Sequence, residues 1–389
     1  MSYRNWSEFW WENITGPNYI LTNITECLLN NVNVVFIVPS DLPWRYDMRR
    51  ILEDRVKERS DLYELLVEFI DAEDEYPADE KAGTFLLKKY AQNMEVLNGF
   101  RDRGQKSIQE YLKKNEVLRN RIIWVKGLTG TAAKDWMEFC KNYSSEGINT
   151  GLFVLEVHNV GNIVESSNLK SISYEGNISA NDIQVFNEFI LNEEHGSDEL
   201  WNNYIATVTA CLCDQDAEIS ELLIRTNIFK SEPPECGLQR IAGMQKYQRR
   251  GGDEHSSHIL ALVRNNDENE INRRIWIAQV KILFPIIEME RNAIIKKYKT
   301  NIEYALQYND IGQYNEKLVY PEDVELGTLI YMMHNNAPNS EYRMLYIPEQ
   351  EVRDRISFLR ECRNTIAHAK ICNPQQVKEL VTSHNSFVK

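Results

Sequence analysis

The chain has 389 residues, of which 43% are apolar and 10% aromatic, and its net charge is −14 at pH 7. This composition predicts a folded protein of two or three domains and excludes a disordered chain. Because no run of about 20 apolar residues occurs, the sequence predicts no transmembrane helix and no membrane partner. Residues 1–11 lack the basic start and apolar core of a signal peptide, so we expect a cytoplasmic protein.

The seven cysteines are scattered along the chain and odd in number. Cys211 and Cys213 form a close pair, but a zinc site would need a second such pair. We therefore expect free, mostly buried thiols and no metal.

The N-terminal part alternates strand-like and helix-like segments, which predicts an α/β domain with a mainly parallel sheet. Short apolar runs of the kind found in buried parallel strands occupy residues 33–38, 122–125 and 151–157. Helical patterns occupy residues 46–57 and 132–143. The acidic residues 71–80 are expected to form an exposed loop.

A sheet of this type often binds a nucleotide, but no segment matches the phosphate-binding glycine loop, which ends in Gly-Lys followed by Ser or Thr. The segment from Gly127 to Lys134 follows a strand without that pair. The order of segments resembles a P-loop-type ATPase that has lost its loop; an unrelated α/β scaffold is the alternative. We expect no ATP hydrolysis and no bound cofactor. Trp44 and Arg45 either lie at the ligand-binding carboxyl edge of the sheet or form a tight turn.

Residues 181–225 have helical patterns and complete an N-terminal domain that we place at residues 1–229. Residues 230–271 contain several glycines and prolines and are expected to be a linker or flexible segment. Within it, Asp253, Glu254, His255 and His258 have the residue types of metal ligands, but a second cluster is missing from the sequence. The remaining residues, 272–389, are expected to form an all-α bundle.

Charge also divides the chain at Asn272, after which 16 lysines and arginines face 14 aspartates and glutamates. The C-terminal part is thus +2, and within the total of −14 the rest is −16. An acidic body carrying a near-neutral module is compatible with RNA contact.

The last strongly helical segment, residues 355–372, contains polar residues that its apolar stripe does not require. Arg363 falls in the core-facing row, so it needs either an acidic partner, for which Glu288 and Glu290 are candidates, or a bound anion such as phosphate. Asn364 and His368 are four residues apart and share a helix face. A histidine exchanges protons near neutral pH, and an arginine holds phosphate oxygens. The alternative is structural: a paired arginine, and a histidine that caps the helix.

These residues resemble a known family. Arg363 and Asn364, followed by three residues and His368 on a late helix, are similar to the R-polar-x-x-x-H signature of the HEPN superfamily of all-helical domains. Many HEPN proteins are metal-independent RNA endonucleases of toxin and anti-phage systems, with a site formed where two copies meet. The resemblance implies that Arg363 and His368 are catalytic and that Asn364 orients them.

Two functions are therefore expected as alternatives. The first is a metal-independent endoribonuclease, a hydrolase effector of a toxin or anti-phage defence module, which binds RNA, forms a homodimer through its C-terminal bundle and is regulated by its N-terminal domain or by a partner protein. The second is a non-catalytic regulatory or adaptor protein that binds a partner protein or a nucleotide.

Overall fold

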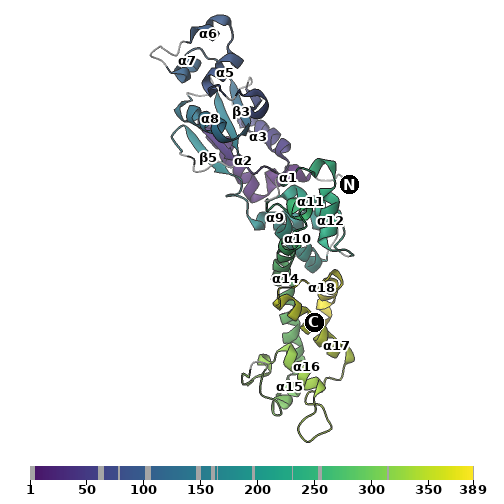
Figure 1. The fold of residues 1–389 in the computed structure, drawn as a ribbon. Coiled ribbons are helices and arrows are strands. Elements are labelled where there is room, and N and C mark those ends of the chain that lie inside the picture. Colours follow the sequence, from purple (N-terminus) through teal and green to yellow (C-terminus); the bar gives the residue numbers. More distant parts are fainter. Residues whose placement is uncertain are drawn as a thin grey trace. The chain divides into compact units, whose positions relative to one another are not determined.

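The computed structural model describes residues 5–59, 65–77, 79–100, 107–145, 150–158, 163, 165–194, 198–229, 231–252, 256–312 and 315–388. The chain forms two compact units (Figure 1). Unit 1 contains Met1–Phe186 and Gln215–Glu218, and unit 2 contains Asn187–Asp214 and Ile219–Lys389. Among the described residues, none of the helices is both long enough and apolar enough to cross a membrane.

Unit 1 is built on a five-stranded sheet in the order β2-β3-β4-β1-β5, in which every pairing of neighbours is parallel. Its strands are β1 (Asn33–Ile37), β2 (Leu66–Asp71), β3 (Arg121–Leu128), β4 (Leu152–Val157) and β5 (Leu169–Ser173). β1 and β4, which are far apart in sequence, are neighbours, with Val34 opposite Val154. The expected α/β domain with a parallel sheet is therefore confirmed.

The helices of unit 1 are α1 (Trp6–Asn13), α2 (Thr15–Leu29), α3 (Arg45–Arg59), α4 (Ala72–Glu75), α5 (Ala82–Tyr90), α6 (Met94–Gly99), α7 (Ile108–Lys114) and α8 (Gly130–Asn142), with the first part of α9 (Ala180–Glu194). One core cluster joins α5, α7 and α8 to side chains such as Ile123, Phe153 and Leu155. Because side chains alternate along a strand, Trp124 and Glu156 point to the opposite face, toward α3.

The three expected strands correspond to β1, β3 and β4. β2 and β5, the two edges of the sheet, were not predicted. The acidic residues 71–80 are not simply a loop, since Asp71 ends β2 and caps α4 by accepting a hydrogen bond from the Glu73 backbone N–H. An aspartate that caps the backbone in this way allows a helix to begin within the acidic segment.

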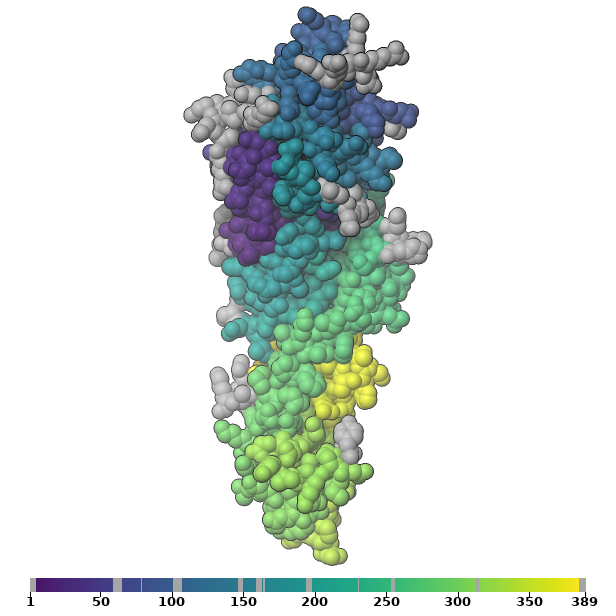
Figure 2. All heavy atoms as spheres, turned by 90° about the vertical axis from the view of Figure 1, so that its left-hand side faces the viewer, coloured from purple at the N-terminus to yellow at the C-terminus, as the bar shows by residue number. Residues whose placement is uncertain are grey.

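Unit 2 is helical in its described part. It contains the rest of α9, then α10 (Glu199–Cys213), α11 (Ala217–Arg225) from Ile219 onward, α12 (Pro234–Ala242), α13 (Ile259–Arg264), α14 (Glu268–Lys297), α15 (Lys299–Leu306), α16 (Leu326–His334), α17 (Gln350–Ala367) and α18 (Pro374–Val388), with short 3-10 turns at Gln245–Tyr247 and Pro321–Asp323. The long α14 is the central element, and α10, α17 and α18 pack against it. The yellow α18 lies beside the green α14 in both views (Figure 1, Figure 2).

The division of the chain differs from the expected domains 1–229, 230–271 and 272–389. The observed boundary is at Phe186, so that α10 belongs with the C-terminal helices. The expected linker contains α12 and α13, whose apolar residues Leu238, Ile241 and Leu260 are buried. Glycines and prolines here end helices and start them, as Pro234 does at the first turn of α12.

Candidate functional site

The expected catalytic residues lie at the end of α17. This helix buries Val352, Ile356, Leu359 and Ile366, the apolar stripe seen in the sequence. It ends at His368, the C-cap residue, and Ala369 then adopts a left-handed φ of 55°. The Lys370 backbone N–H donates to the Thr365 carbonyl at 3.0 Å, which closes the helix in a Schellman-like turn.

Two hydrogen bonds from α14 fix the segment that carries His368. The indole N–H of Trp276 donates to the Ile366 carbonyl at 2.7 Å. Gln279 brackets Cys372, accepting from its backbone N–H at 2.7 Å and donating to its carbonyl at 3.0 Å. Because Gln279 is buried, these bonds are shielded from water and hold the turn after α17 in one position.

Arg363 is half-buried and paired with an acid. Its Nη2 lies 3.1 Å from Oε2 of Glu325, the residue before α16. Its Nε is buried and has no hydrogen-bond partner among the described residues. Of the two alternatives for Arg363, the structure shows an acidic partner, although this partner is Glu325 and not Glu288 or Glu290. One donor of the guanidinium has no hydrogen-bond partner among the described residues.

Asn364 and His368 line an open surface pocket of about 440 Å³, and Arg363 is not part of its lining. Every lining residue has a polar side chain: Ser357, Arg360, Glu361, Asn364, Thr365, His368 and Lys370. Neither the Asn364 side chain nor the His368 ring makes a hydrogen bond to the part of the chain that the structure describes. The structure therefore places Asn364 and His368, the predicted i,i+4 pair, in one pocket, whereas Arg363 of the same chain does not line it.

The buried arginine of α17 is Arg355, which the sequence did not single out. Its Nε and Nη2 donate to the two carboxylate oxygens of Glu290 at 2.7 and 2.8 Å. Nδ1 of His384, on α18, lies 3.1 Å from the same carboxylate. These three buried residues link α14, α17 and α18, and both carboxylate oxygens of Glu290 have partners among them. A bidentate pair of this kind is a structural element.

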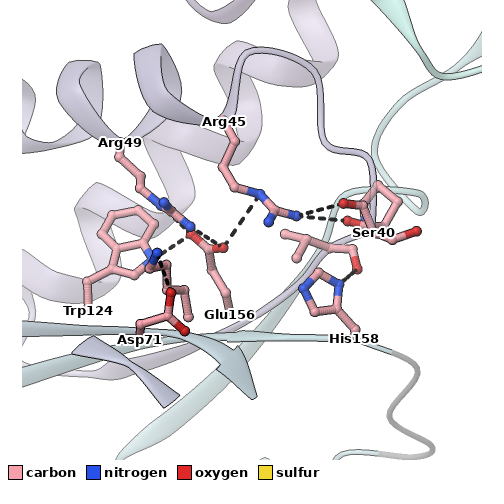
Figure 3. A network of polar contacts seen from close by, with 10 residues as sticks. Ser40, Arg45, Arg49, Asp71, Trp124, Glu156 and His158 are labelled. Atoms are coloured by element: carbon pink, nitrogen blue, oxygen red, sulfur yellow. Dashed lines mark hydrogen bonds and ion pairs between the residues drawn. The ribbon is translucent and has the colours of Figure 1, made fainter. Parts of the chain in front are cut away.

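A second polar cluster lies at the carboxyl edge of the sheet in unit 1 (Figure 3). Glu156 of β4 is fully buried, and Arg49 of α3 donates to its two oxygens from Nε and Nη2, both at 2.7 Å. The Trp124 indole N–H donates to Oε1 at 2.7 Å, and Arg45 Nε lies 3.8 Å from Oε2. Arg45 therefore lies at this edge, and its Nη2 also donates to the carbonyls of Pro39 and Ser40 and so holds the turn after β1.

Open α/β sheets bind ligands at this edge, between neighbouring strands whose connections to the next strand run in opposite directions along the sheet. β1 and β4 are such neighbours, because β2 and β5 lie at opposite ends of the sheet. In this protein the Glu156 carboxylate lies between Arg45 and Arg49, in the position that a bound anion would take. His158, directly after β4, donates from Nδ1 to the Val38 carbonyl at 3.0 Å. Burial, together with the nearby charge of Arg45, lowers the pKa of His158. Both oxygens of Glu156 are bound by protein donors, and the cluster has the character of a structural lock.

The metal-ligand residue types noted in the sequence are only partly visible. Asp253, Glu254 and His255 lie outside the described residues. His258 caps α13, where its Nδ1 accepts from the Leu260 backbone N–H at 3.2 Å. Within the described ranges, no three His, Cys, Asp or Glu side chains gather as they do around a metal ion.

Comparisons with known proteins complete the description of the site. No protein-family model matches the chain, and no curated protein matches it. Among solved structures, the chain is similar to a DNA polymerase III gamma subunit-related protein from Thermotoga maritima, with 13% identity, a TM-score of 0.27 and coverage of 95% of this chain and 99% of that one. It is also similar to Drosophila ORC bound to poly(dA/dT) DNA, with 8% identity, a TM-score of 0.26 and coverage of 95% and 70%. These TM-scores are too low to support an argument, so function is argued from the residues of this chain.

Proposed function

We propose that the chain is a metal-independent endoribonuclease whose active site is built around Asn364 and His368. The observation that carries the proposal is the open pocket at the end of α17, whose lining residues all have polar side chains. Arg360 and Lys370 supply positive charge there against one acid, Glu361, so the pocket favours a phosphate group. The donors on Asn364 and His368 are available to an RNA, since neither side chain is used by the described residues.

His368 supplies the proton transfer that such a cleavage needs, because imidazole gives and takes protons near neutral pH. It removes the proton from a ribose 2′-hydroxyl, whose oxygen then forms a bond to the adjacent phosphorus. The bond between phosphorus and the 5′-oxygen breaks, and the leaving oxygen receives a proton from a water molecule. The products are a 2′,3′-cyclic phosphate and a 5′-hydroxyl, and no metal-bound water takes part.

The phosphate-binding arginine comes, in this proposal, from a second copy of the chain. Arg363 does not line the pocket of its own Asn364 and His368, and its Nε is unsatisfied among the described residues. In a homodimer formed through the C-terminal helices, Arg363 of one copy binds the phosphate in the pocket that contains His368 of the other copy. The α/β unit, whose ligand position is filled by Glu156, is then regulatory, in a toxin or anti-phage defence module with a partner protein.

Mixing two inactive variants tests this arrangement. Arg363→Ala and His368→Ala should each lose cleavage of a mixed pool of ribosomal, transfer and messenger RNA in the presence of a chelator. When they are mixed and allowed to exchange subunits, a heterodimer regains one complete site, because its intact arginine and intact histidine come from different chains. Activity should therefore return to a substantial fraction of the wild-type level.

If the mixture stays inactive while the two variants demonstrably form heterodimers, the shared site is refuted. If the wild type also cleaves no RNA, the second function gains support: a non-catalytic regulatory or adaptor protein. One observation favours that alternative, namely that Arg363 already has an acidic partner in Glu325 and so has a structural role without any substrate.

A further inference from the structure

A pocket of about 210 Å³ in unit 2 is not used by the proposed function. It lies between the start of α12, α10, α14 and the turn that joins α17 to α18. Its walls are mainly apolar, formed by side chains such as Tyr204, Phe229, Pro233, Ile275, Ile371 and Val377. A dry cavity of about 150 Å³ is enough to hold a benzene ring. The space therefore suits a molecule built on one ring or a short alkyl body.

One ionisable group in this apolar wall has an unmet hydrogen bond. Oε2 of Glu235, in the first turn of α12, is buried and has no hydrogen-bond partner among the described residues. A buried acceptor in this state costs free energy until a donor arrives. Glu235 lines the pocket, so a bound molecule is the donor that the site lacks.

The charges around the pocket decide the kind of donor. Burial raises the pKa of Glu235; its own backbone N–H opposes this change, and the carboxylate of Glu268 adds to it. A second acid, Glu232, also lines the pocket, and its carboxylate is paired at 2.6 Å with Arg240. Because Glu232 already has a cationic partner, Glu235 is the pocket carboxylate that favours a positively charged guest, which would offset the cost of burying its charge.

We propose that this pocket binds a small organic cation, an ammonium or amidinium group on an apolar body, with Glu235 as its counter-ion. The cationic N–H groups donate to the buried Oε2 of Glu235, and the apolar body lies against Tyr204, Phe229 and Ile275. The site is independent of RNA cleavage and stands whether or not the chain is a nuclease.

Benzamidine is a suitable probe, because it is a planar amidinium on one ring, and benzamide is its uncharged counterpart of nearly the same shape. Binding to the full chain is measured by thermal shift and by titration calorimetry, for the wild type and for Glu235→Gln. A charge-assisted hydrogen bond to a buried group predicts that benzamide, or the substitution, weakens binding by about tenfold or more in Kd. Affinity for the wild type should also rise with pH as Glu235 ionises.

No measurable benzamidine binding to the wild type overturns the proposal, and so does equal binding to Glu235→Gln. Equal binding of benzamide and benzamidine overturns it as well, since the pocket would then select its ligand by shape and not by charge. If Glu235→Gln does not fold, the pH series and the benzamide comparison decide the matter with the wild-type protein alone.

Discussion

Two polar regions of this protein have opposite chemistry. At the sheet edge of unit 1, Glu156 is fully buried, and its oxygens are bound by Arg49 and Trp124. At the end of α17 in unit 2, Asn364 and His368 are open to solvent in a pocket, and their side chains make no hydrogen bond to the described residues. In the first region the carboxylate is bound by protein donors, whereas in the second the side chains of Asn364 and His368 are available to a ligand.

This difference shows that a function cannot be assigned to a site from its position in the fold alone. The carboxyl edge of a parallel sheet is where α/β proteins usually bind ligands, yet here protein groups take that role. The functional site is better sought where polar groups have no protein partner, because such groups can bind a substrate.

The largest expected effect comes from breaking the lock in unit 1. Glu156→Ala leaves Arg49 buried without its counter-ion, which should lower the free energy of unfolding by about 3 to 5 kcal/mol. Chemical denaturation with a two-state fit to the unfolding of unit 1 measures the loss. Replacing Glu156 and Arg49 together by leucine and methionine should recover much of it, because no uncompensated charge remains.

A small loss in Glu156→Ala, comparable to that of a surface substitution, would contradict the reading of this cluster as a lock. The anion position would then be available to a ligand, and the contrast between the two regions would disappear.

A smaller effect is expected from the histidine at the same sheet edge. Burial and the charge of Arg45 lower the pKa of His158 in the folded state. Its contribution to stability is therefore present above the unfolded pKa of about 6.5 and is lost as pH falls through the lower folded value. His158→Gln should reduce the drop in Tm between about pH 7 and pH 5. The exposed His334→Gln is the control, and an unchanged drop in His158→Gln would count against the assignment.

How much of the fold the sequence predicts depends on burial. β1, β3 and β4 are central strands, covered on both faces, so their residues form continuous apolar runs that are easy to recognise. β2 and β5 are edge strands in which Glu68 and Lys170 interrupt the pattern, and neither strand was predicted. The helices of the C-terminal part were predicted because α14, α17 and α18 each bury one stripe.

The site was predicted in part for a similar reason. Asn364 and His368 are local, so their spacing alone places them on one face. The choice of which arginine is buried depends on contacts between distant segments. Arg355 and Glu290 are 65 residues apart, and helical spacing does not indicate that this pair, rather than Arg363 with Glu290, forms the buried contact. Glu156 and Arg49, 107 residues apart, were not recognised as a pair for the same reason.

The most direct test of the central claim compares two histidines, each near the C-terminus of a helix. His368 ends α17 in the polar pocket, and His334 ends α16 outside it. With chelator present and RNA as substrate, His368→Ala should lose about 10²- to 10⁴-fold in cleavage rate, while its stability changes by no more than about 1 kcal/mol. His334→Ala should cleave like the wild type. If His368→Ala cleaves RNA as fast as His334→Ala, the account of this pocket as a nuclease site is contradicted.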